Sequence, residues 1–401
     1  MLYLDHAATT PISDEVLFAM KPYFTEKYGN PSSIYALGRE AKDALCDARH
    51  AASRLLGAEK PGEIIFTSGA TESNNLAIKG VAFYASQVLG IKPHIMVSNV
   101  EHHCVLDTAK YLEKYFGFEV SYIPVDKEGV VDLDYIFENI YENTVLISVM
   151  YGNNETGTIE PIKDIAFLVQ KAKEKREKTG NKNPLVFHTD AVQAFQYLTM
   201  NVRDLGVDML SLTAHKFYGP KGVGLLYAKA GTKLLPQQQG GAQERGLRAG
   251  TENVACIVGM TAAMEASKKL KVESNKLVTE LRAYLVERVL KEIPDVELLG
   301  PKDSDKRLPH IASFLFKRVE GESILINLDL LKIAASSGSA CTSGSLEPSH
   351  VTKAMGIADI DAHGAVRFSL GKLNTKDDID VLMNHLPKIV EKLRAMSPIK
   401  E

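Results

Sequence analysis

Short apolar runs recur between residues 63 and 212, and most are separated by stretches in which apolar residues return at helical spacing. Each run suits a buried strand. The predicted strands are 63–67, 94–98, 120–124, 145–150, 185–188 and 209–212. Strands that alternate with helices predict an α/β fold in which a mainly parallel mixed sheet is flanked by helices. In such folds ligands collect at the carboxyl ends of the strands.

Helical patterns lie on both sides of these runs. Ser13 is a suitable N-cap for a first helix, and apolar residues at helical spacing from Leu37 to Leu56 lead to Gly57, a suitable stop. Two longer helical patterns run from about residue 252 to residue 294. We therefore expect two separate helices in that region.

The last third of the chain has a mixed character. It contains strand candidates at 296–299, 311–316, 333–335 and 366–370, and it closes with an amphipathic helix at 376–396. We expect a large α/β domain at residues 13–264. Residues 1–12 and 265–401 should form a smaller α+β domain.

Composition narrows the class of partner. Among 401 residues, 45% are hydrophobic and 24% charged, and the net charge of −3 gives no electrostatic reason to expect nucleic acid or a membrane surface. No basic segment followed by an apolar segment opens the chain, as a secretory signal would require. We expect a cytoplasmic protein whose four scattered cysteines are free thiols.

Polar clusters follow several of the predicted strands. Gly69-Ala70-Thr71 opens a helix, where free backbone N–H groups could hold a phosphate, although an ordinary helix cap explains the same residues. Asp190 closes one strand, and His215-Lys216 follows the next. A partly desolvated lysine can form an imine with a carbonyl, and a carboxylate can keep a pyridine nitrogen protonated. Together these features predict a site for pyridoxal 5′-phosphate.

His102, His103 and Cys104 follow the strand at 94–98. Zinc ligation is one interpretation, but consecutive side chains rarely point at one ion, and no second cluster stands nearby in the sequence. We favour a titratable ring beside a cofactor. The meaning of His103 and Cys104 stays open.

Several motifs together resemble one known family over essentially the whole chain. The chain is similar to the group I cysteine desulfurases of the NifS/IscS type, which belong to the class V aminotransferase branch of the fold-type I pyridoxal-phosphate-dependent transferases. The motifs that carry the resemblance are 5–10 (DHAATT), 29–33 (GNPSS), 67–74 (TSGATESN), 101–102 (EH), 153–157 (NNETG), 190–193 (DAVQ), 214–222 (AHKFYGPKG), 243–251 (QERGLRAGT), 336–343 (SSGSACTS) and 367–371 (RFSLG).

The resemblance implies a role for each matching residue. Lys216 would form the Schiff base with the cofactor, Asp190 would pair with its ring nitrogen and His102 would stack on the ring and move protons. The other implied cofactor contacts are Ala70, Thr71, Asn154, Gln193, Thr213, His215 and, from the second subunit of a homodimer, Thr251. Asn154 and Arg367 would hold the substrate, with Arg367 gripping its carboxylate.

Residues 336–345 contain five serines and two glycines around Cys341, a composition that favours a mobile arm. The resemblance implies that the Cys341 thiolate takes sulfur from L-cysteine, so that L-alanine leaves and a persulfide remains on Cys341. No metal ligand is firmly predicted, and a role for Cys341 as a transient ligand of an iron–sulfur cluster stays open.

Other functions on the same scaffold also stay open. A selenocysteine lyase or an aminotransferase could use the same cofactor site, and an inactive scaffold could only dock iron–sulfur assembly proteins. The expected recipient of the sulfur is an iron–sulfur scaffold protein or another acceptor.

Overall fold

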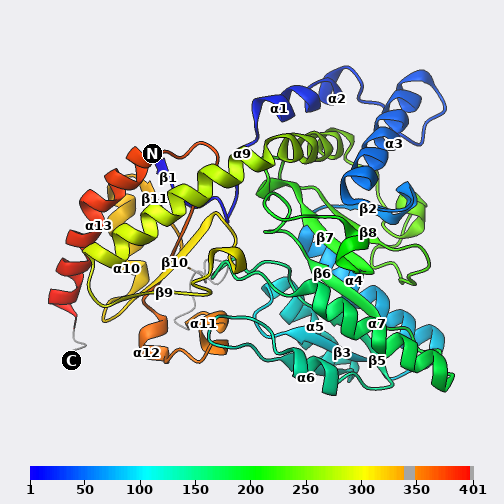
Figure 1. Cartoon of the computed structure of the whole chain (residues 1–401). Coiled ribbons are helices and arrows are strands. Elements are labelled where there is room, and N and C mark those ends of the chain that lie inside the picture. Colours follow the sequence, from blue (N-terminus) through cyan, green and yellow to red (C-terminus); the bar gives the residue numbers. More distant parts are fainter. Residues whose placement is uncertain (338–347, 398–401) are drawn as a thin grey trace.

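The computed structural model describes residues 1–337 and 348–397. Within them, seven strands form one sheet in the order β2-β8-β7-β6-β5-β3-β4 (Figure 1). Their bounds are β2 (Ile64–Thr67), β3 (His94–Ser98), β4 (Glu119–Ile123), β5 (Thr144–Ser148), β6 (Val186–Asp190), β7 (Met209–Thr213) and β8 (Gly224–Ala228). Six of these strands confirm the predicted runs.

β8 is the strand that the sequence pattern did not predict. It runs antiparallel to both β2 and β7, whereas the other neighbouring pairs are parallel. Its apolar residues follow directly on the glycine-rich turn after Lys216, so the run is short and lies beside strong turn signals.

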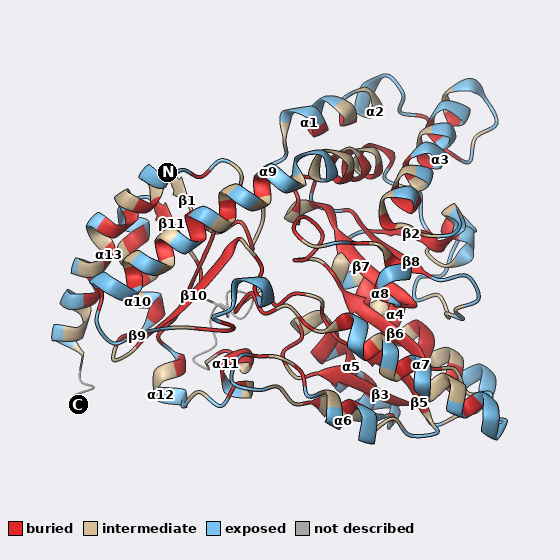
Figure 2. Ribbon diagram, viewed as in Figure 1, coloured by how far each residue is buried: buried red, intermediate tan, exposed pale blue. Residues whose placement is uncertain are grey.

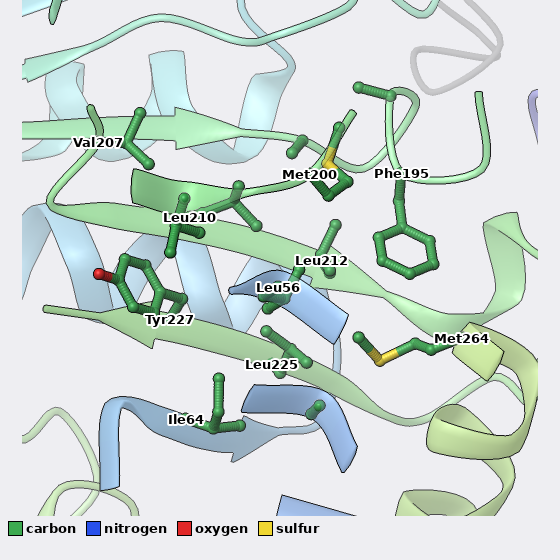
Figure 3. Close-up of a cluster of buried hydrophobic side chains, with 14 of the residues drawn as sticks. Leu56, Ile64, Phe195, Met200, Val207, Leu210, Leu212, Leu225, Tyr227 and Met264 are labelled. Atoms are coloured by element: carbon green, nitrogen blue, oxygen red, sulfur yellow. The ribbon is translucent and has the colours of Figure 1, made fainter. Parts of the chain in front are cut away.

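Successive strand residues point to opposite sides of the sheet, and most strands are buried along their whole length. Both faces are therefore covered by helices. On one face, Ile65, Val97 and Leu226 pack against α4 (Ala70–Phe83) and α5 (His103–Phe116). On the other face, buried strand residues pack against α3 (Ala36–Leu56), α7 (Ile162–Thr179) and the first half of α9. Figure 3 shows part of this second core, where Leu212 and Leu225 lie near Met264 of α9.

α9 is a single helix, Val254–Glu292, of 39 residues and therefore about 58 Å long. Its first half packs in the core of the large sheet, and its second half packs in another core through Val278, Leu285 and Val289. The prediction of two separate helices was therefore wrong. The polar stretch between the two apolar patterns lies where the helix passes from one core to the other (Figure 2), and backbone hydrogen bonds continue there without an apolar face.

The second core surrounds a smaller sheet in the order β12-β10-β9, which is antiparallel throughout. Its strands are β9 (Val296–Leu298), β10 (Ile311–Phe316) and β12 (Ala365–Ser369), and α10 (Gly321–Leu330) and α13 (Lys376–Met396) pack beside them. β1 (Leu2–Tyr3) pairs in parallel with β11 (Ile333–Ala334), so the start of the chain joins this part. The exact limits of the two domains stay a prediction, since the boundary expected at residue 264 falls inside α9.

The remaining helices are short and connect the main elements. They are α1 (Asp14–Met20), α2 (Pro22–Thr25), α6 (Leu133–Glu138), α8 (Val202–Leu205), α11 (His350–Ala354) and α12 (Asp359–Ala362). Ser13 is the N-cap residue of α1, as predicted, but its hydroxyl makes no capping hydrogen bond. Along the described ranges, no helix combines the length and apolar character needed to cross a bilayer.

Gly224 is the closest contact between β8 and the turn that opens α4. A Cβ atom on Gly224 would lie 2.6 Å from the carbonyl carbon of Gly69 and 2.7 Å from the carbonyl oxygen of Leu212. Because both neighbours are backbone atoms, the chain could make room only by moving the turn. The turn before α4 can therefore approach β8 this closely only because residue 224 is a glycine.

We expect Gly224→Ala to lower the free energy of unfolding by about 1–3 kcal/mol, the usual cost of overpacking a tight site. The matched control is Gly62→Ala, because a Cβ atom there would meet nothing within 4 Å. Urea unfolding of both variants measures the difference. Equal stability of Gly224→Ala and the wild type would contradict the tight contact.

Candidate functional site

The carboxyl ends of β2, β3, β5, β6 and β7 surround a cavity of about 540 Å³. All the predicted site residues line this cavity except Thr251 and Cys341. Those that line it are Ala70, Thr71, His102, Asn154, Asp190, Gln193, Thr213, His215, Lys216 and Arg367. Thr251 is exposed and lies outside the cavity lining, and Cys341 lies outside the described residues.

Lys216 follows β7 and is held by the N-terminal segment. Its Nζ donates hydrogen bonds of 2.7 Å to the carbonyl oxygens of Ala7 and Ala8. The Gln193 side-chain amide donates to the same Ala7 oxygen at 2.9 Å. The carbonyls of Ala7 and Ala8 are site components that the sequence reasoning missed. Backbone groups carry no residue-type signal, so only the motif at residues 5–10 pointed to this segment.

Asp190 ends β6 and is buried. Its Oδ2 accepts a hydrogen bond of 2.6 Å from the Asn74 amide, and its Oδ1 accepts one of 3.0 Å from the backbone N–H of Val192. Burial raises the pKa of the Asp190 carboxyl, and these two hydrogen bonds oppose that effect. A cation placed beside Asp190 would favour the ionised carboxylate further. This carboxylate is therefore suited to partner a protonated ring nitrogen.

His102 is the N-cap residue of α5. Its Nδ1 accepts a hydrogen bond of 3.2 Å from the backbone N–H of Cys104, and the Cys104 Sγ lies 3.0 Å from the same nitrogen. Burial lowers the pKa of His102, although Asp190 opposes this. The His103 ring lies edge-on to His350 at 4.8 Å between centroids. In the described part of the chain, no group of three or more His, Cys, Asp or Glu side chains is placed to hold a metal ion.

The first turn of α4 forms the end of the cavity nearest β2. A helix start leaves backbone N–H groups without carbonyl partners in the helix, and here Ala70 and Thr71 occupy that position. The Ser68 N–H is already bound to the Glu72 carboxylate at 2.7 Å. Burial lowers the pKa of the neighbouring His215 to about 4, with help from Lys216, so that ring is neutral at pH 7. This end of the cavity can bind an anion through neutral donors.

Arg367 comes from β12 of the smaller sheet and reaches the same cavity. Its Nη1 donates to the backbone oxygen of Asn154 at 2.7 Å, and its Nη2 donates to Asp5 Oδ1 at 2.9 Å. Among the residues that the structure describes, its buried Nε has no hydrogen-bond partner. A buried guanidinium donor without an acceptor is costly, and a substrate carboxylate would supply one.

Comparison with known proteins shows the family to which this chain belongs. The family model described as aminotransferase class-V matches residues 2–382. The chain therefore belongs to the aminotransferase class-V family, and the predicted family and fold class are confirmed.

Particular members share most of the sequence. A protein of Dictyoglomus turgidum named cysteine desulfurase IscS is 50% identical over 400 residues, which cover 100% of this chain and 97% of that protein. A solved NifS-like protein is 37% identical with a TM-score of 0.88, covering 98% of this chain and all of the other. A structure titled SspA in complex with cysteine is 35% identical with a TM-score of 0.80, covering 94% of this chain and all of that one.

His188 lies on β6, two residues before Asp190, and is fully buried. Its ring nitrogens contact the hydroxyls of Ser148 at 2.8 Å and Ser211 at 2.9 Å, and burial lowers its pKa to about 3. Between that pKa and its ordinary value of 6.5, the unfolded chain binds a proton at this residue that the folded chain does not. Stability is therefore lost as the pH falls below 6.5.

We expect the wild-type free energy of unfolding to fall by about 1.4 kcal/mol per pH unit for His188 alone as the pH drops from 6.5 to about 4. His188→Gln should reduce the slope by that amount. Urea unfolding at several pH values measures it, with His363→Gln as a control because His363 is exposed. An unchanged slope in His188→Gln would show that the buried ring takes up a proton as readily as the unfolded chain.

Proposed function

We propose that this protein is a pyridoxal 5′-phosphate-dependent cysteine desulfurase, which converts L-cysteine to L-alanine and leaves a persulfide on Cys341. The observation that carries the proposal is the placement of Lys216, Asp190 and the start of α4 around one cavity. The names of the curated relatives support the same activity. The predicted cysteine desulfurase activity is thus the activity named for relatives that match this chain over essentially its full length.

The residues of the cavity fit the proposed cofactor. Lys216 offers an amine for its aldehyde, Asp190 offers a buried carboxylate for its ring nitrogen, and Gln193 lines the cavity beside Lys216 as a donor for its ring hydroxyl. Ala70, Thr71, Thr213 and His215 would hold its phosphate. When bound, the cofactor supplies an electron sink for the negative charge that develops on the substrate α-carbon.

The protein residues have separate tasks in the proposed reaction. Arg367 and Asn154 hold the substrate carboxylate, and the amine of Lys216 takes the proton from the α-carbon. The Cys341 thiolate attacks the substrate sulfur, so a sulfur–sulfur bond forms while the carbon–sulfur bond breaks and leaves its electron pair on carbon. Protonation of that carbon and return of a proton to the α-carbon give alanine. His102 serves as a proton carrier beside the reacting atoms.

The cofactor and the sulfur transfer are separable by mutation. We expect Cys341→Ala to keep the yellow absorbance of bound pyridoxal 5′-phosphate but to release no sulfide from L-cysteine, because the attacking thiolate is missing. Lys216→Ala should lose the absorbance. Cys46→Ala is the matched control, because its thiol is exposed on α3 and remote from the cavity lining, and it should behave like the wild type.

Each other outcome identifies a different function. Sulfide release at the wild-type rate by Cys341→Ala would contradict the proposed role of this thiol. Transamination that does not need Cys341 would indicate an aminotransferase, and alanine formation from selenocysteine without Cys341 would indicate a selenocysteine lyase. A wild-type protein without a cofactor band after incubation with pyridoxal 5′-phosphate would favour an inactive docking scaffold.

We further propose a cytoplasmic homodimer that delivers its sulfur to an iron–sulfur scaffold protein or another acceptor. Thr251 is exposed and lies outside the lining of its own cavity, where a residue that serves a second subunit would lie. Large apolar side chains are also exposed on α1, on α2 and before α3, which supports a covered surface. These side chains are Leu17, Phe18, Phe24, Tyr28, Ile34 and Tyr35.

Subunit mixing tests both the dimer and the role of Thr251. Sedimentation should give twice the chain mass of 44.0 kDa. Thr251→Ala should bind pyridoxal 5′-phosphate about tenfold more weakly, because one hydrogen bond to the phosphate is lost. In a mixed dimer of Thr251→Ala and Lys216→Ala subunits, one site has both residues intact and should recover tight binding. A monomer, or no recovery in the mixed dimer, would contradict this assignment.

A further inference from the structure

Cys104 is the second residue of α5, lines the cavity and lies between two residues of the proposed site. Its Sγ is 3.0 Å from His102 Nδ1 and 3.1 Å from Asn74 Nδ2. Asn74 in turn donates to Asp190 at 2.6 Å. A continuous chain of polar contacts therefore joins His102 to Asp190 through Cys104 and Asn74.

In this series of contacts, the backbone N–H of Cys104 and the Asn74 amide nitrogen can only donate, and they fix the roles of the other groups. The backbone N–H of Cys104 donates to His102 Nδ1, so that nitrogen is unprotonated and the neutral ring carries its proton on Nε2. Of the two side-chain contacts of Cys104 Sγ, only Nδ1 can accept the S–H, because the Asn74 contact is made by an amide nitrogen that donates. The Asn74 amide has two hydrogens, and their acceptors are Asp190 Oδ2 and Cys104 Sγ. The thiol thus accepts from Asn74 while it donates to His102.

We propose that Cys104 is a positioning residue for the proposed reaction, whose thiol holds His102 as the neutral ring with its proton on Nε2 and holds Asn74 against Asp190. The effect on the reaction rests on the proposed function, in which His102 is the proton carrier and Asp190 is the partner of the cofactor ring nitrogen. The contacts themselves are properties of this chain. While Nδ1 accepts these hydrogen bonds, the neutral ring presents its Nε2–H as a hydrogen-bond donor.

Cys104 is unsuited to the alternative role of a second sulfur acceptor. Burial raises the pKa of its thiol, and the nearby Asp190 raises it further, so Cys104 stays protonated. The thiolate is the nucleophilic form of cysteine. A protonated thiol between a ring nitrogen and an amide serves as a hydrogen-bond link.

Loss of the thiol would affect both neighbours. Cys104→Ala leaves one buried hydrogen of the Asn74 amide without an acceptor, and the Oδ1 of Asn74 already has no partner in the described part of the chain. It also removes a donor that favours the neutral His102 ring. Within the described residues, the groups with charge effects on this ring are Asp190, Lys216, His103 and His350. All four are unchanged in the variant, so a shift in the titration of His102 reports the thiol.

Nitrogen NMR of the ¹⁵N-histidine-labelled full chain tests the inference, with and without pyridoxal 5′-phosphate. His102→Gln identifies the His102 signals. We expect the His102 ring of Cys104→Ala to titrate about one pH unit higher than in the wild type, which corresponds to one lost hydrogen bond. Cys104→Ser should return the titration toward the wild-type midpoint, because a hydroxyl can both accept and donate.

The matched control is Cys256→Ala, because Cys256 is also partly buried in the first turn of a helix, α9, but lies away from the cavity lining. It should leave the His102 titration unchanged. The pH profile of sulfide release should move in the same direction as the titration in Cys104→Ala and recover in Cys104→Ser.

The outcomes separate this inference from the proposed function. An identical His102 titration in the wild type and Cys104→Ala would overturn the role of Cys104, even if sulfide release were normal. A wild-type protein that released no sulfide would contradict the proposed function, while the titration would still decide whether the thiol controls the ring. If Cys104→Ala fails to fold, a serine variant that titrates unlike the wild type would equally overturn the inference.

Discussion

The direction of the strands is the constraint on which the cavity depends. Because β2, β3, β5, β6 and β7 all run the same way, each must end at the same edge of the sheet, and the chain leaves that edge through a loop every time. Loops at this edge can carry polar residues without burying them in the apolar layers. β8 departs from this direction, and its Gly224 lets the turn before α4 approach it closely.

A second set of contacts closes the cavity from outside the sheet. The N-terminal segment places two backbone carbonyls on Lys216, and the smaller sheet contributes Arg367, which is tied to Asp5 of that same segment. The first residues of the chain thus connect a lysine and an arginine that lie about 150 residues apart in sequence. The site is complete only when both sheets and this segment are in place.

Much of this arrangement was predictable from local pattern. Apolar runs located six of the seven strands of the large sheet, and a turn or polar cluster after each run located Asp190, Lys216 and the start of α4. Contacts between distant segments were not predictable in this way. The Ala7 carbonyl and the Asn74–Cys104 contact depend on tertiary placement, since neither has a characteristic spacing. The resemblance to a family identified the residues but not their hydrogen bonds.

The continuity of α9 has a mechanical consequence for the reaction. Phe217, next to Lys216, packs in one core, Val366 and Phe368, on either side of Arg367, pack in the other, and α9 packs in both. A helix resists bending because its hydrogen bonds must lengthen on the outer side. The continuous helix therefore helps to fix the position of the core beside Lys216 relative to the core beside Arg367.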